Sequence, residues 1–308
     1  MVSQLLLYKI LQLFFMLGLG FLLVKTKIIK GIESKVLSKL SLYLFMPAVI
    51  INCFSLDMTE SIIKGLLLAF FAAIIIHIVL LCLDIVCKKF LKGASVERAS
   101  VIYSNAGNLI IPIVTFVLGE KWVIYSCAFL VVQIVFMWTH GLSLFSDDEN
   151  FDFRKIFLNV NMIAIYIGFA MLLFNFKLPV FVKDITSELG NMLGPVGMII
   201  TGMLAADMDF KKALIDKRIY VVAFFRMIIC PLLMFVLLKI ILSLVCLENA
   251  DSILLVSYLA CITPSASTIT QFAQIYNKDT DFAVAINIVT TLVCIITMPL
   301  FVHFFNMI

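Results

Sequence analysis

Long apolar stretches separated by short polar segments form the main pattern of this chain. A window of about 20 residues with almost no charge is typical of a transmembrane helix, because such a helix spans a hydrocarbon core of about 30 Å. The pattern predicts an all-α polytopic membrane protein with ten transmembrane helices and no soluble domain. The ten windows cover residues 4–24, 36–55, 62–86, 98–118, 122–145, 156–176, 185–206, 219–246, 252–276 and 282–306.

The basic residues of the polar segments lie mainly on one side of the predicted helices. If the N-terminus faces outward, the inner loops hold 16 Lys and Arg residues and the outer loops hold 4. Cytoplasmic loops are enriched in these residues, so we expect a multi-pass protein of the plasma or inner membrane with both termini outside. No basic segment precedes Lys9, so we expect a mature first helix and not a signal peptide. The net charge of +4 then reflects topology and does not indicate nucleic acid as a partner.

Composition excludes a soluble globular protein and gives no sign of an enzyme. Hydrophobic residues make up 63% of the chain and charged residues 14%, whereas soluble domains are about half apolar. The eight cysteines show no C-x-x-C pairing, so we expect buried thiols, no metal site and no cofactor. The three histidines fall in separate windows without an H-E-x-x-H motif, so enzyme chemistry is not expected.

The windows divide into two groups of five around the most polar segment. Residues 1–146 are predicted to form a first five-helix repeat, 147–155 a cytoplasmic linker and 156–308 a second repeat. Because five is odd, the second repeat must have the opposite orientation. Helix-breaking residues recur at matching places, since Asn105 and Pro264 are 159 residues apart. Inverted repeats with paired broken helices are typical of secondary transporters, although prolines also kink transmembrane helices without any functional role.

The stretch YSNAGNLIIPI, residues 103–113, interrupts the fourth window. Pro112 cannot donate a hydrogen bond to the carbonyl of Asn108, and Gly107 tolerates non-helical torsions. The side-chain amides of Asn105 and Asn108 can satisfy backbone groups that an interruption leaves unpaired. The fourth helix is therefore predicted to unwind around Asn105 and Pro112.

The ninth window contains an equivalent interruption at Pro264, which frees the carbonyl of Ala260. Thr268 and Gln271 have the T-x-x-Q spacing of a capping box, which predicts that a new helix begins there. Two half-helix N-termini at the bilayer centre would present free N–H groups and about half a positive charge each, which suits a carboxylate. The candidate substrate-binding residues are Ser104, Asn105, Gly107, Asn108, Pro112, Thr263, Pro264, Ser265, Ser267, Thr268 and Gln271.

The segments SNAGNLIIP at 104–112 and TPSASTITQFAQIYNKD at 263–279 resemble the paired motifs of the auxin efflux carrier family. This family includes plant auxin carriers and bacterial relatives that move small organic acids, and the resemblance covers essentially the whole chain. It implies a fold like that of bile-acid/sodium symporters, with a scaffold of helices 1, 2, 6 and 7 and a transport domain of helices 3–5 and 8–10. It also implies a homodimer through the scaffold and contact between Asn105 and the substrate carboxylate. Thr268 stands where bacterial relatives typically have asparagine, which leaves the identity of the acid open.

Other polar residues inside the windows are candidates for a cavity or ion site. His77 could carry a proton or be a neutral, hydrogen-bonded side chain, and Arg226 could extend to the membrane surface or balance a bound anion. The uncharged residues could line the cavity, bind a cation or form hydrogen bonds between helices. This set comprises His77, Gln133, Arg226, Asn287, Thr290 and Thr291.

These observations predict a secondary transporter for a small organic anion, a mono- or dicarboxylate resembling auxin or malate and malonate. The substrate would bind at the crossing of helices 4 and 9 and move by alternating access, with H⁺ or Na⁺ as possible coupling ions. The alternatives are a sodium- or proton-coupled symporter for another substrate class on the same fold, or an anion channel. A cation/proton antiporter is not expected, because residues 122–145 contain no acidic side chain.

Overall fold

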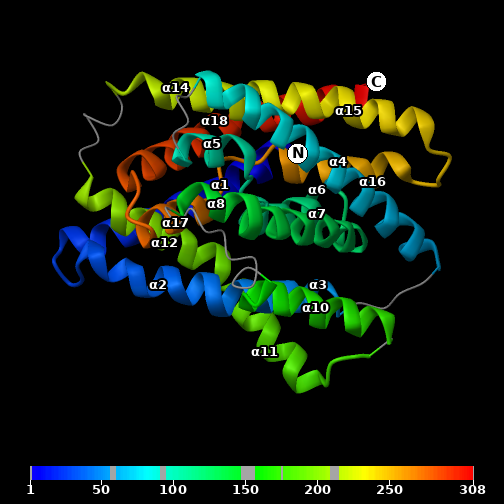
Figure 1. Cartoon of the computed structure of the whole chain (residues 1–308), viewed down its shortest axis with the longest axis horizontal. Helices are drawn as coiled ribbons and strands as arrows, with labels where there is room; N and C mark the ends of the chain where they lie inside the picture. Colours follow the sequence, from blue (N-terminus) through cyan, green and yellow to red (C-terminus); the bar gives the residue numbers. More distant parts are fainter. Residues whose placement is uncertain are drawn as a thin grey trace.

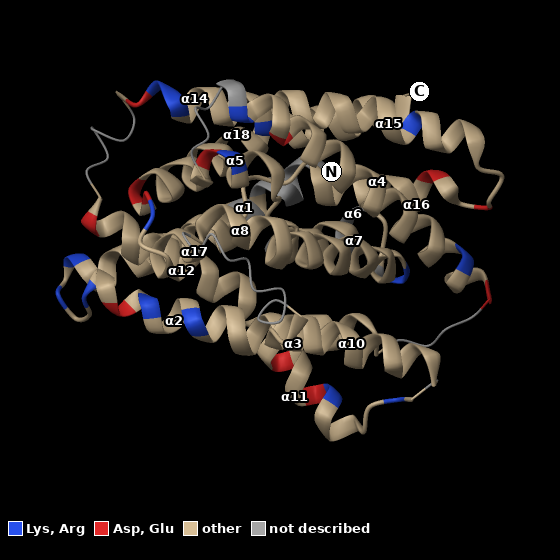
Figure 2. Cartoon of the chain, viewed as in Figure 1, with Lys and Arg blue, Asp and Glu red and all other residues tan. Residues whose placement is uncertain are grey.

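The computed structural model describes residues 2–55, 60–90, 95–146, 157–174, 176–208 and 215–307. These residues form helices joined by short turns, and no strand longer than one isolated bridge occurs among them. Most helices run along the long axis of the molecule (Figure 1). Their middle stretches carry few charges, and the charged side chains gather at helix ends and connecting turns (Figure 2). The prediction of an all-α protein is confirmed for the described residues.

The first half of the chain contains both long and interrupted helices. Its elements are α1 (Val2–Lys25), η1 (Gly31–Glu33), α2 (Ser34–Leu40), η2 (Ser41–Phe45), α3 (Met46–Cys53), α4 (Glu60–Phe90), α5 (Ser95–Ile102), α6 (Ala106–Val117), η3 (Glu120–Trp122), α7 (Val123–Phe136), η4 (Met137–Gly141) and α8 (Leu142–Phe145). The predicted linker at 147–155 lies outside the described residues.

The second half begins with a helix that lies beside α3. Its elements are α10 (Val160–Leu173), α11 (Val180–Asn191), α12 (Leu193–Asp207), α14 (Lys217–Phe224), η5 (Phe225–Ile229), α15 (Cys230–Leu244), α16 (Ala250–Cys261), α17 (Ser267–Ile275) and α18 (Thr280–Met307). Each predicted window thus contains helical residues in its described part.

Six helical stretches of the described residues are long and apolar enough to cross a membrane. These stretches are Gly31–Cys53, Glu60–Lys88, Val123–Phe145, Val180–Asp207, Lys217–Leu244 and Thr280–Met307. Three further apolar helices are shorter, namely Leu11–Lys25, Val160–Leu173 and Ala250–Cys261.

In several of these helices, the helical turn before a proline is irregular. One π-helical turn, η2, ends two residues before Pro47, and another, η5, ends two residues before Pro231. A proline removes one backbone hydrogen bond and crowds the carbonyl four residues earlier, and a wider turn accommodates both effects. α11 and α12 are separated at Met192, three residues before Pro195. Pro299, in contrast, lies inside the uninterrupted α18.

The helices pack in two groups. α1 lies along α12, and α3 packs against α10 and α11, which form the lower part of Figure 1. α4 packs against α7 and α16, while α14 and α15 lie with α18 at the upper edge of the same view. The broken helices α5–α6 and α16–α17 lie between these two edges, where α6 and α17 both contact α12.

Candidate functional site

The first helix break lies at residues 103–105. α5 ends at Ile102, and α6 begins at Ala106 with Asn105 as its N-cap. α6 then continues through position 112 without interruption, so the prediction of unwinding at Pro112 is wrong. A proline inside a helix costs one backbone hydrogen bond there, whereas the backbone at 103–105 gains partners outside its own helix. The side chains of Asn108 and Pro112 lie outside the described part of the structure.

The second break surrounds Pro264, as the sequence predicts. α16 ends at Cys261 and α17 begins at Ser267. The hydroxyl of Thr263 donates to the carbonyl of Ala260 at 3.0 Å, and this is the carbonyl that Pro264 leaves without its usual donor. The side chain of Thr263 therefore compensates for the proline.

The predicted capping box of Thr268 and Gln271 is wrong. α17 starts one residue earlier, with Ala266 as an N-cap that makes no side-chain hydrogen bond. The amide of Gln271 instead donates to the hydroxyl of Ser41 at 3.3 Å. The side chain of Gln271 thus bonds to Ser41 of another helical segment and not, as the spacing suggests, to the backbone of Thr268.

The two breaks contact each other through their backbones. The N–H of Asn105 donates to the carbonyl of Pro264 at 2.8 Å, and the N–H of Ala266 donates to the carbonyl of Tyr103 at 3.0 Å. Ser104 and Ser265 form an antiparallel bridge between these two bonds. The N-termini of α6 and α17 consequently begin side by side.

Side chains from α7 and α18 bind the backbone of the two bridge residues. Both the N–H and the hydroxyl of Ser104 donate to Oε1 of Gln133, whose Nε2 donates back to the Ser104 carbonyl at 2.9 Å. Nδ2 of Asn287 donates to the carbonyl of Ser265 at 3.0 Å, and the N–H of Ser265 donates to the hydroxyl of Thr290 at 3.2 Å. Thr291 bonds within its own helix, to the carbonyl of Asn287.

Some polar atoms at the breaks are buried without a protein partner. Oδ1 of Asn105 accepts a bond from the hydroxyl of Ser267 at 3.4 Å, but Nδ2 of Asn105 has no acceptor in the part of the chain that the structure describes. The hydroxyl of Ser265 likewise has no partner among the residues described. Both residues are at least 97% buried, so the site contains donors whose desolvation is not compensated by the described protein atoms.

A cavity of about 20 Å³ lies at the first break. Its polar lining consists of Ser104, Asn105, Gln133 and Thr268, and Gly107 contributes backbone. A space of this size holds about one water molecule. The arrangement seen here is therefore too tight for an organic anion.

A larger cavity of about 540 Å³ adjoins the small one, and Gly107 and Val49 line both. Its polar residues include Asn52, Lys183 and Asn191. Lys183 and Asn191 are exposed, so this cavity connects the neighbourhood of the breaks with the surface.

His77 and Arg226, two of the polar candidates from the sequence, are not among the described residues that line the small cavity. His77 is buried with its Nδ1 2.7 Å from the carbonyl of Ala73, so Nδ1 carries the proton of that bond. Its ring stacks on Phe136, with centroids 5.3 Å apart. Arg226 is fully buried, which rules out extension to the membrane surface, and it contacts the carbonyl ends of both broken helices.

Sequence reasoning overlooked Tyr103 and a polar network beside it. The hydroxyl of Tyr103 lies 2.8 Å from the carbonyl of Phe136 and 2.9 Å from Nδ1 of His140. Nε2 of His140 is 3.4 Å from Asp84, which also pairs with Arg98. In the sequence, only the position of Tyr103 directly before Ser104 and Asn105 could have indicated that its side chain takes part in a polar network.

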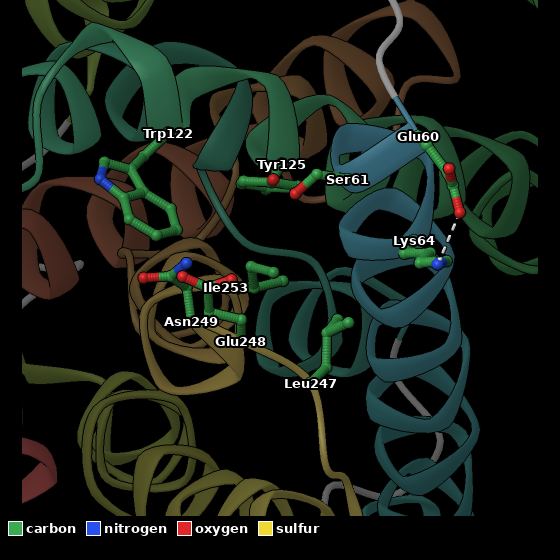
Figure 3. A pocket seen from close by; sticks show the side chains of 9 residues that line it. All are labelled: Glu60, Ser61, Lys64, Trp122, Tyr125, Leu247, Glu248, Asn249 and Ile253. Carbon is green, nitrogen blue, oxygen red and sulfur yellow. Dashed lines mark hydrogen bonds and ion pairs between the residues drawn. The ribbon is translucent and has the colours of Figure 1, made fainter.

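Another cavity, of about 570 Å³, lies away from the breaks. Figure 3 shows Trp122 and Tyr125 on one side of it and the ion pair of Glu60 and Lys64 on another. Its described lining includes no residue predicted for substrate binding.

A family model described as "membrane transport protein" matches residues 5–302, and this match confirms the family predicted from the two motifs. No individually curated protein matches the chain.

Proposed function

Because the chain belongs to the membrane transport protein family, we propose that it is a secondary transporter for a small organic anion, either a monocarboxylate or a dicarboxylate. The anion binds where α5–α6 and α16–α17 are interrupted. The contact between the two breaks carries this proposal, since the bonds from Asn105 to Pro264 and from Ala266 to Tyr103 bring two helix N-termini together.

The chemistry of the breaks suits a carboxylate. The first turn of a helix has N–H groups without intrahelical acceptors and carries about half a positive charge, so two adjacent N-termini attract an anion. Nδ2 of Asn105 and the hydroxyl of Ser265 are buried donors without acceptors among the described residues. Thr268, at the edge of the small cavity, supplies another hydroxyl. A carboxylate accepts bonds from all three groups.

The proposal includes ten membrane-spanning helices in two inverted five-helix repeats. Two equivalent hydrogen bonds support it. The N–H of Ser104 donates to Gln133 in the first half of the chain, and the N–H of Ser265 donates to Thr290 in the second half. Ser104 and Ser265 are 161 residues apart, and Gln133 and Thr290 are 157 apart. Such similar offsets are what a duplicated five-helix unit would produce.

Transport proceeds by alternating access of a transport domain, α4–α8 and α14–α18, relative to a scaffold, α1–α3 and α10–α12. The packing of α1 on α12 and of α3 on α10 and α11 supports the scaffold as one unit. Because the cavity at Asn105 measures only about 20 Å³, the anion needs movement of the surrounding helices to bind. The adjoining cavity of about 540 Å³, with Lys183 in its lining, provides the route from the outer side.

Thermal stability of the purified protein tests the binding site. We expect indole-3-acetate or malonate to raise the melting temperature, because a ligand that binds only the folded state stabilises it by RT ln(1 + [L]/Kd). The variant Asn105→Ala should weaken that binding about tenfold or more without preventing membrane insertion. The matched control is Asn306→Ala, at an exposed position near the end of α18. Unchanged affinity of Asn105→Ala would refute this site.

Flux through proteoliposomes separates a carrier from an anion channel. We expect uptake of the responding acid to saturate with its concentration and to show counterflow, because each cycle moves a bound substrate. An ohmic, non-saturating current would instead favour a channel.

A further inference from the structure

Arg226 is a buried cation whose hydrogen-bond donors all point to backbone carbonyls. It lies in the wide turn η5 and is 0% exposed. Its Nε donates to the carbonyl of Thr263 at 3.1 Å, and its Nη2 donates to the same oxygen at 2.8 Å and to the carbonyl of Cys261. Its Nη1 donates to the carbonyls of Val101 at 3.1 Å and Ile102 at 3.4 Å.

These five bonds use the full capacity of a guanidinium group, which has five N–H donors and no acceptor. No donor remains for a carboxylate of the protein or of a substrate. Arg226 therefore does not contact a bound anion in this arrangement, and its charge acts through the backbone that it binds.

The acceptors of Arg226 lie at the carbonyl ends of the two broken helices. Val101 and Ile102 are the last residues of α5, Cys261 is the last residue of α16, and Thr263 follows in the break. The last carbonyls of a helix lack intrahelical donors and together carry about half a negative charge. One guanidinium thus binds the negative ends of two helices whose partners, α6 and α17, begin a few residues later.

The charges at this point of the fold can be counted from helix dipoles. The ends of α5 and α16 together carry about one negative charge, and the starts of α6 and α17 together carry about one positive charge. Without a cation, the partial charges of the four helix ends would cancel. The charge of a bound anion would then have no counter-charge in a medium of low dielectric constant. With Arg226 on the negative ends, the positive ends remain available for one carboxylate.

We infer that Arg226 is the built-in cation of the anion site and takes the place that a co-transported metal ion would otherwise occupy among these carbonyls. This inference rests on the proposed function and adds to it that binding of a monocarboxylate needs no Na⁺ or K⁺. Arg226 is a positioning residue: it sets the geometry of both breaks and supplies their charge balance. Arginine suits the position better than lysine, because its rigid planar fork reaches carbonyls of two helices at once.

The first test compares cation dependence in the purified protein. We expect the melting temperature and carboxylate affinity of the wild type to be the same in sodium, potassium and choline chloride at equal ionic strength. In Arg226→Gln the carbonyls lose their cation, so sodium should raise the melting temperature relative to choline. Lys239→Gln removes the same charge from the neighbouring α15, where Lys239 lies over the ring of Phe305, and it should show no such difference.

The second test measures binding of indole-3-acetate and malonate. We expect Arg226→Gln to bind the responding acid at least tenfold more weakly in choline and to recover at least threefold in sodium or guanidinium chloride. Arg226→Lys keeps the charge and should retain sodium-independent binding, although weaker than that of the wild type. A merely structural arginine would lower stability without making affinity depend on the cation.

Several outcomes would overturn the inference. Sodium-dependent carboxylate binding by the wild type would do so, and so would unchanged affinity of Arg226→Gln in choline. If Arg226→Gln does not fold, the wild type and Arg226→Lys still decide the question, because sodium dependence of either contradicts it. If no carboxylate binds the wild type, the proposed substrate class fails, while the stability of Arg226→Gln in sodium and choline still tests the role of the arginine.

Discussion

Gln133 shows how a single side chain can stabilise an unwound segment inside a membrane protein. Its amide accepts from the N–H of Ser104 and donates to the carbonyl of the same residue, so it replaces both backbone bonds that the helix break removes. Unsatisfied backbone groups are costly in an apolar medium, and irregular backbone persists there only when the protein supplies partners. Asn287 and Thr290 do the same for Ser265.

Replacing Gln133 with Met should therefore destabilise the protein. The change keeps the approximate volume but leaves the buried N–H and carbonyl of Ser104 unpaired, at a cost of about 1–3 kcal/mol each. Ser126→Ala is the control, because Ser126 lies on the same helix and its buried hydroxyl makes no hydrogen bond among the described residues. Thermal unfolding of both variants in detergent checks this prediction. Equal melting temperatures for the two would contradict it.

At the scale of helices, a ladder of polar side chains joins α17 to α2 and η2. Nε2 of Gln274 donates to the hydroxyl of Ser34 at 2.6 Å, and its Oε1 accepts from the hydroxyl of Ser38 at 2.7 Å. Gln271 continues the ladder to Ser41. In the proposed mechanism, α2 belongs to the scaffold and α17 to the transport domain. Under that proposal, the ladder closes the site on the side that the positive-inside rule assigns to the cytoplasm.

Removing the ladder should open that side more often. Each hydrogen bond contributes about 0.5–1.5 kcal/mol, so Gln274→Ala should increase the open population about fivefold or more. The readout is labelling of Asn105→Cys by a membrane-impermeant thiol reagent applied to the cytoplasmic side, in protein whose exposed Cys82 and Cys246 are replaced by Ser. Gln12→Ala, on α1, is the control because it makes none of these bonds. An unchanged labelling rate in Gln274→Ala would show that the ladder is not a gate.

For the molecule as a whole, a close backbone contact joins α1 and α12. α1 comes from the first half of the chain and α12 from the second, and both belong to the proposed scaffold. A Cβ atom at Gly202 would meet the carbonyl oxygen of Leu17, and one at Gly20 would meet the carbonyl oxygen of Ile199. Small residues allow helices in membranes to approach closely, where packing replaces the hydrophobic effect as the driving force. These glycines therefore set the distance between α1 and α12.

Gly202→Ala should lower stability, although alanine normally favours a helix over glycine by about 1 kcal/mol. The added methyl group meets backbone, which cannot rotate away, so overpacking costs about 1–3 kcal/mol or more. Gly18→Ala is the matched control, because a Cβ there meets nothing within 4 Å and should be neutral or stabilising. Melting temperatures of the two variants should shift in opposite directions. A stabilised Gly202→Ala would mean that the helices can separate at little cost.

Features that depend on local composition could be predicted from the amino-acid sequence alone. The apolar windows predicted where helices form, because helix burial in a bilayer requires only that consecutive side chains be apolar. The two motifs indicated the family, and Pro264 located the second break because it cannot donate a backbone bond wherever it lies. The sequence also singled out Asn105, Gln133 and Arg226 as polar residues in apolar surroundings.

The partners of those polar residues, in contrast, come from contacts that form only in the folded protein. The first break falls at 103–105 and not at Pro112, because the backbone there bonds to a segment about 160 residues away. Gln271 binds Ser41 across 230 residues instead of capping its own helix, and Arg226 binds carbonyls 35 to 125 residues away. No local periodicity encodes such pairings, since their partners come together only when the helices pack, and the choice among competing partners is made by burial.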